Sequence, residues 1–119
     1  MSRIAILQAQ TGIDPARNTA ALVAAIDQAK AGGAQMLFTP EMSGLLDRDR
    51  ARARPNIHAE ADDPLLAAVR DAAAKAGLWV HLGSLALQGP DGRFYFTSAF
   101  SDTLIQTIPA TSDGQGRAT

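Results

Sequence analysis

The stretch QMLFTPEMSGLL (residues 35–46) poses the central question of this sequence. A short apolar run, MLF, stops at Thr39 and Pro40, and the next residue is the carboxylate Glu41. The length and composition of residues 35–38 predict a buried strand, which Pro40 ends because proline cannot continue a strand's hydrogen bonds. The sequence therefore places an ionisable side chain directly beyond a buried strand.

Two amphipathic helices are predicted around this strand, and both begin with the same local signals. Aspartate is a good N-cap, and proline fits the first helical position because its missing N–H would be unpaired there. Glycine after the last apolar residue can take the left-handed conformation that ends a helix. The predicted helices run from Asp14-Pro15 to Gly32 or Gly33, and from Asp63-Pro64 to Gly77.

Three further strands complete the predicted order. Residues 3–8 read as a buried strand and residues 78–87 as a further strand. QGPDGR makes a turn that returns the chain antiparallel as FYFTSAF, residues 94–100. The order is strand, helix, strand, helix, strand, hairpin, strand. Strands separated by helices predict right-handed parallel crossovers and a layered α/β sheet, whose last strand has no partner on its outer edge.

The remaining segments carry weaker signals. Residues 45–61 are rich in alanine and arginine but interrupted by Pro55, so that a helix or a loop is expected. The run DRDRARAR mixes acidic and basic residues, which favours a solvated face over a nucleic-acid patch. Residues 111–119, rich in small polar residues and glycine, are expected to be disordered or poorly packed.

Composition limits the classes of function. The chain has 119 residues, 46% of them apolar, and a formal net charge of −1. This balance favours neither nucleic acid nor a membrane as a partner, and neither a membrane span nor a signal peptide is expected. The chain has no cysteine, which excludes a disulfide, a thiolate metal site or a cysteine nucleophile within it. A cytoplasmic location is the default expectation.

Glu41 is the strongest candidate for chemistry. In open α/β sheets, ligands bind beyond the carboxyl ends of the parallel strands, and Glu41 follows such an end. A carboxylate that is partly desolvated at this rim is suited to accept and return a proton. The alternative is an ordinary loop glutamate that pairs with an arginine of residues 48–54.

The chain resembles the nitrilase superfamily, the carbon–nitrogen hydrolases. The resemblance rests on a first strand ending in Gln8, a helix containing Asn18, an apolar strand leading into Pro40-Glu41, and GLWVHLGSLAL followed by a Gly-Asp-Gly type of turn. It covers about residues 3–100, and within the family it is most similar to aliphatic amidases and omega-amidases. Order and spacing carry it more than any single motif.

The resemblance implies an α-β-β-α sandwich, no metal or organic cofactor, and a Glu–Lys–Cys triad that cleaves non-peptide amides, with nitriles as the alternative. Glu41 matches the family's glutamate, the general base. The cysteine thiolate attacks the substrate carbon, and the lysine helps to hold the oxyanion. A small amide is thus the implied partner, and the family usually forms homo-oligomers.

The sequence departs from the family towards its end. The family's lysine lies beyond the fourth strand, where this chain reads TIPATSDGQGRAT, without lysine or histidine. The family's nucleophilic cysteine would fall further on. We therefore expect residues 1–108 to be a partial carbon–nitrogen hydrolase domain, truncated and inactive by itself, followed by a disordered or off-family tail, residues 109–119.

Other candidate sites are weaker. Ser43 lacks the Gly-x-Ser-x-Gly elbow of a serine hydrolase, and His58 and His81 lie too far apart for a metal site. His81 is expected to be a packed strand residue. Lys30 and Lys75 each fall at a helix end, where a cation complements the helix dipole, so neither replaces the triad lysine. A small α/β binding or interaction module without chemistry remains the alternative function.

Overall fold

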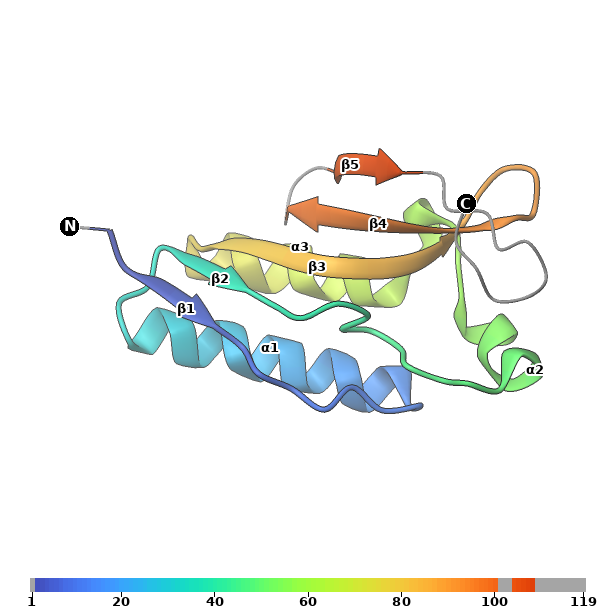
Figure 1. Cartoon of the computed structure of the whole chain (residues 1–119). Helices are drawn as coiled ribbons and strands as arrows, with labels where there is room; N and C mark the ends of the chain where they lie inside the picture. The colour runs from blue at the N-terminus through green and yellow to red at the C-terminus, as the bar shows by residue number, and fades with distance from the viewer. Residues whose placement is uncertain (1, 101–103, 109–119) are drawn as a thin grey trace.

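The computed structural model describes residues 2–100 and 104–108 (Figure 1). Its elements, in chain order, are β1 (Ile4–Ile6), α1 (Pro15–Ala31), β2 (Met36–Phe38), α2 (Arg50–Ala53), the 3-10 turns η1 (Arg54–Asn56) and η2 (Glu60–Asp62), α3 (Pro64–Ala76), β3 (Trp79–Gln88), β4 (Phe94–Phe100) and β5 (Leu104–Ile108). The predicted order is confirmed as far as β4. The tail predicted to be disordered, residues 111–119, lies outside the described residues.

The strands form one five-stranded sheet in the order β1-β2-β3-β4-β5. β1, β2 and β3 are parallel, and β4 returns antiparallel to β3, as the hairpin signals predicted. The expectation that β4 ends the sheet was wrong, because β5 pairs antiparallel with it. The edge of β4 offers unpaired backbone groups, and the apolar segment LIQTI satisfies them at the cost of one register shift.

The Asp-Pro helix signals are confirmed in atomic detail. The Asp14 carboxylate accepts from the backbone N–H of Ala16 at 3.0 Å, and that of Asp63 accepts from Leu66 at 2.9 Å. Pro15 and Pro64 open the two helices. At the other ends, Gly33 and Gly77 have φ of 79° and 66°, the left-handed conformation that glycine adopts freely.

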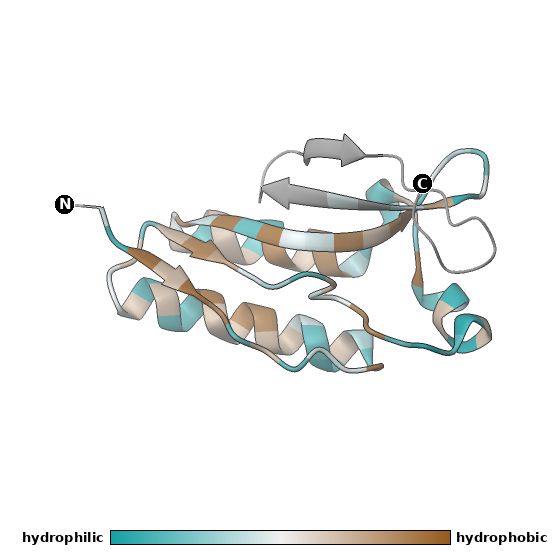
Figure 2. Cartoon of the chain, in the orientation of Figure 1, coloured by the Kyte–Doolittle hydropathy of each residue, from teal (hydrophilic) through white to brown (hydrophobic). Residues whose placement is uncertain are grey.

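One apolar core lies between the sheet and the two long helices. Successive right-handed crossovers in the same direction place α1 and α3 on the same face of the sheet, where they contact each other (Figure 1). Figure 2 shows apolar residues alternating along β3, as a half-buried strand requires. The most buried members of the core are Ile26, Leu66, Val69, Val80, Leu82 and Leu87.

The opposite face of the parallel strands is mostly apolar, and its residues are exposed or half-buried. Ile4, Met36 and Trp79 stand in register across β1, β2 and β3, and so do Ile6, Phe38 and His81. Ile4, Ile6 and Trp79 are 58%, 71% and 52% exposed. The prediction that β1 is a buried strand was wrong: among the described residues, helices cover only one side of the sheet. We call these six residues the open sheet face.

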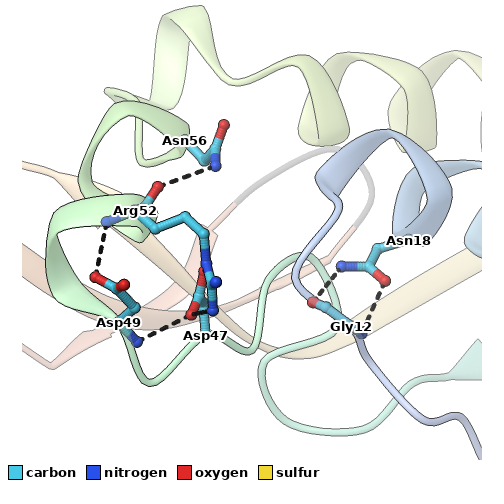
Figure 3. A network of polar contacts seen from close by, with 6 residues as sticks. All are labelled: Gly12, Asn18, Asp47, Asp49, Arg52 and Asn56. Atoms are coloured by element: carbon cyan, nitrogen blue, oxygen red, sulfur yellow. Dashed lines mark hydrogen bonds and ion pairs between the residues drawn. The ribbon is translucent and has the colours of Figure 1, made fainter.

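Residues 45–61, expected to be a helix or a loop, contain the short helix α2 and two 3-10 turns. Asp47 accepts from Arg52 through both carboxylate oxygens, at 2.6 and 2.7 Å, and Asp49 caps α2 through the Arg52 N–H (Figure 3). The Arg52 guanidinium holds the pKa of Asp47 below its ordinary value. Residues 48–52 and 54 are exposed, as predicted for a solvated face, whereas the Asp47 side chain is covered.

Candidate functional site

Glu41 lies where the sequence predicted, in the turn that follows β2 at the carboxyl edge of the parallel strands. Its side chain is exposed and forms no hydrogen bond or ion pair with the residues that the structure describes. The partly desolvated environment expected for Glu41 is therefore not formed by these residues. The alternative, pairing with an arginine of residues 48–54, is not seen among them either.

The backbone on both sides of Glu41 is fixed by serine hydroxyls. The Ser43 hydroxyl donates a short hydrogen bond to the carbonyl of Pro40, which belongs to the peptide preceding Glu41. The Ser84 hydroxyl, on β3, accepts from the N–H of Met42 at 2.9 Å, in the peptide following Glu41. Both peptide groups attached to the Glu41 Cα atom are thus held, which fixes where its side chain leaves the backbone.

Met42 adopts a conformation that needs such support. Its φ of 52° is the only positive value among the described non-glycine residues. A left-handed residue with a side chain costs about 1–2 kcal/mol. The bonds from Met42 N–H to the Ser84 hydroxyl and from Ser43 N–H to the Ser84 carbonyl, at 2.9 and 3.4 Å, help to offset this cost.

The hydroxyls of Thr39 and Ser43 form a directed chain. They lie 2.8 Å apart, both are buried, and Thr39 Oγ1 accepts from the N–H of Gly83 at 3.4 Å. Because Ser43 gives its only hydroxyl proton to Pro40, Thr39 must be the donor to Ser43. The chain of bonds therefore runs from the β3 backbone through two side chains to the carbonyl beside Glu41.

Gly83 allows β3 to approach this turn closely. A Cβ atom at this position would lie 2.6 Å from the carbonyl oxygen of Thr39 and 2.7 Å from the carbonyl carbon and oxygen of Pro40. These are backbone atoms, which cannot move aside as a flexible side chain can. The absence of a side chain at Gly83 therefore determines how the Glu41 turn packs on β3.

Asn18 joins the same turn to the loop that follows β1. Its side-chain amide exchanges two hydrogen bonds with the backbone of Gly12, at 3.0 and 2.9 Å (Figure 3), and donates a third to the carbonyl of Gly44 at 2.8 Å. The Leu46 N–H also donates to the Gly12 carbonyl, at 3.1 Å. Asn18 is only 9% exposed, so these bonds form in a largely dry environment.

A hollow of about 360 Å³ lies beside this turn, between the N-terminal ends of α1 and α3. Its walls include Leu45, His58, Asp63 and Leu85, but Glu41 is not among its lining residues. Burial raises the pKa of Asp63, whose carboxylate lies 3.8 Å from His58 Nδ1. The carboxylates that cap α1 and α3, those of Asp14 and Asp63, are among its lining residues and would repel an anionic ligand.

The other sequence candidates are dispersed. His81 packs its ring against Phe38 with centroids 5.5 Å apart, as expected for a packed strand residue. Lys30 and Lys75 lie in the last turns of α1 and α3, as predicted, and Lys75 pairs with Asp71 at 3.0 Å. Within residues 2–100 and 104–108, no cluster of three histidine or acidic side chains could hold a metal ion. No helix in that part of the chain is long and apolar enough to cross a membrane.

Comparison with known proteins identifies the family of this chain. Residues 3–103 match the family model for carbon–nitrogen hydrolases. The chain belongs to the carbon–nitrogen hydrolase family. A sequence search among curated proteins finds no significant match.

Solved structures show the same fold. NitN amidase from Nesterenkonia sp. AN1 is 22% identical, with a TM-score of 0.74, and the match covers 100% of this chain and 49% of the amidase. A mutant of the Nesterenkonia amidase in complex with butyramide is 25% identical, with a TM-score of 0.70, and the match covers 91% of this chain and 42% of the amidase. A mutant of an N-terminal amidase is 11% identical, with a TM-score of 0.68, and the match covers 87% of this chain and 26% of that amidase. This carbon–nitrogen hydrolase chain thus spans about half the length of the Nesterenkonia amidase and has part of its α/β fold.

Sequence reasoning found part of this candidate site and missed the rest. It placed Glu41 at the strand end and noted Asn18 as a family feature. Thr39 and Ser84 were not singled out, although TPEMS places two hydroxyls around the glutamate. The contact with Ser84 joins residues 42 apart, and no local pattern shows such a contact.

Proposed function

We propose that this chain supplies the general base, Glu41, for hydrolysis of the carbon–nitrogen bond of small non-peptide amides, with nitriles as the alternative substrate class. The observation that carries the proposal is the position of Glu41 at the carboxyl edge of three parallel strands, inside the segment that matches the family. A glutamate held by fixed peptide groups at this edge is well placed to exchange protons with a substrate-bound group.

The chemistry requires a thiol and a cation from outside these 119 residues. In a Glu–Lys–Cys triad, the glutamate takes the thiol proton, the thiolate attacks the amide carbon, and the C–N bond breaks as that proton leaves with ammonia. Water, deprotonated by the glutamate, then cleaves the resulting thioester to release the carboxylic acid and restore the thiol. The lysine stabilises the oxyanion. This chain has no cysteine, so the nucleophile must come from other polypeptide.

The open sheet face and the exposed Glu41 are consistent with a site that other polypeptide completes. In an α-β-β-α sandwich, a second sheet would cover the side that the helices leave open, about 10 Å from the first. The matched amidase is about twice as long as this chain, which leaves room for such a layer. In the proposed complete enzyme, that layer would also wall in Glu41 and supply the desolvation that these residues do not give.

The solved relatives support amides as the substrate class. One structure of the Nesterenkonia amidase, a glutamate-to-glutamine mutant, shows acrylamide added to the active-site cysteine, and another contains butyramide. We extend this to small aliphatic amides for the present chain. A cytoplasmic location and a homo-oligomeric state belong to the same proposal.

Ammonia release from butyramide and glutaramate by the purified chain tests where the triad resides. The proposal predicts equal, background rates for the chain and for Glu41→Gln. Robust turnover that disappears in Glu41→Gln would show that these residues carry a complete site, and would overturn the assignment of the nucleophile to other polypeptide.

The second candidate, a binding module without chemistry, is favoured by one observation, the open sheet face. The coding sequence beyond codon 119 discriminates between the two. A lysine–histidine segment followed by a cysteine in an apolar context, in any frame, supports the enzyme. If neither feature is encoded there, the binding module is favoured.

A further inference from the structure

We infer that Thr39, Ser43 and Ser84 act together as a hydroxyl clamp, a set of positioning residues that fixes the direction of Glu41 from β3. The inference rests on the proposed function only for its catalytic meaning. The clamp itself is a statement about structure and can be tested without any reaction.

The first argument is that the clamp acts on both peptide groups of Glu41. Ser43 donates to the Pro40 carbonyl, and Ser84 accepts from the Met42 N–H. The Pro40 ring restricts its own φ as well. A glutamate in a free turn would sample many backbone conformations, whereas these contacts hold both of its peptide groups.

The second argument is burial. Thr39 and Ser43 are 7% and 4% exposed, so water cannot readily replace their bonds. Their hydroxyls satisfy each other and the Pro40 carbonyl while the glutamate beside them stays exposed. The backbone beside an exposed glutamate is thus held by buried hydrogen bonds that solvent does not compete for.

The third argument is that part of the clamp comes from a strand of the sheet. Gly83 and Ser84 belong to β3, whose neighbour β2 ends at the turn, so the clamp ties Glu41 to the rigid sheet rather than to another loop. Asn18 holds the far end of the same turn at Gly44. Movement of Glu41 by rotation of the turn would break bonds at both ends.

The test is amide hydrogen exchange of the purified chain by nuclear magnetic resonance. Ser84→Ala should speed exchange of the Met42 amide about fivefold, the factor that corresponds to one net hydrogen bond of about 1 kcal/mol. Thr39→Val keeps the side-chain shape but removes the hydroxyl, and should speed exchange at Gly83 by a similar factor and shift the Glu41 amide resonance. Thr39→Ser, which restores the hydroxyl in a smaller side chain, should return both signals towards wild type.

Two controls separate the clamp from general loosening. Leu7 N–H, bonded to the Phe38 carbonyl at 2.8 Å, reports on the strands, and Thr19→Ala removes a hydroxyl bond in α1. The inference is supported if Met42 and Gly83 respond while Leu7 does not, and if Thr19→Ala leaves all three unchanged. It is overturned if Met42 exchanges at the wild-type rate in Ser84→Ala, or if Leu7 rises by the same factor. Neither result depends on whether Glu41 is a catalytic base.

Discussion

Gly83→Ala is the sharpest test of how β3 supports the Glu41 turn. The new Cβ atom would lie 2.6 Å from the Thr39 carbonyl oxygen, about 0.8 Å inside the 3.4 Å at which ordinary contact begins. Because the opposing atoms are backbone, the strand or the turn must move. Overpacking of this kind costs about 1–3 kcal/mol, which lowers the Tm of a domain of this size by roughly 5–15 °C.

The assay is thermal melting followed by circular dichroism, with Gly32→Ala as the matched control. A Cβ at Gly32 would meet its nearest neighbour, the Gln28 carbonyl oxygen, at 3.5 Å, and the φ there is −79°. The control should therefore melt within a few degrees of wild type or slightly higher. If Gly83→Ala melts within about 1 °C of wild type while Gly32→Ala behaves as expected, the close packing of the turn on β3 is refuted.

Three further changes test other parts of the account. Asn18→Ala removes three hydrogen bonds in a dry site and should cost about 2–4 kcal/mol in urea unfolding; a loss below about 0.5 kcal/mol would show that Asn18 does not join the loops. Burial raises the pKa of the Asp63 carboxyl in the folded chain above its ordinary value of 3.8. The free energy of unfolding should therefore be lower above the folded-state pKa, where Asp63 is ionised, and should rise as the pH falls from that pKa towards 3.8. Asp63→Asn keeps the helix cap without the charge and should be at least as stable as wild type at pH 7, whereas Asp63→Ala should lose about 1 kcal/mol of unfolding free energy. Equal losses for the two variants in urea titrations would show that the charge of Asp63 does not lower stability. Ile6→Thr and Trp79→Thr on the open sheet face should reduce light scattering at high concentration without lowering Tm, and a large fall in Tm would mean that these side chains are covered.

Local chemistry explains why the helices could be predicted. Asp14 and Asp63 accept from N–H groups two or three residues away, and Gly77 ends α3 by its own backbone conformation. These interactions are complete within one turn of chain, so the sequence displays them directly. The same holds for the β3–β4 hairpin, whose turn residues lie together.

Relations between distant segments could not be predicted in the same way. An apolar strand such as β1 predicts a buried face, but whether a second layer covers it depends on polypeptide far along the chain. Glu41 was placed correctly at a strand end, yet its exposure depends on which distant segments pack around it, and no local pattern gives that. The pairing of Ser84 with Met42 required the register of β3 against β2, which only the folded sheet supplies.

The central claim is that the Glu41 segment can serve as the proton acceptor of an amidase. Residues 35–46 can be grafted into the Nesterenkonia amidase in place of its matching strand and turn, once with Glu41 and once with Glu41→Gln. If the claim is right, the graft with glutamate releases ammonia from butyramide at least about 100-fold faster than the glutamine graft, the typical contribution of a general base. If both grafts melt cooperatively and hydrolyse butyramide at the same rate, Glu41 is not that proton acceptor.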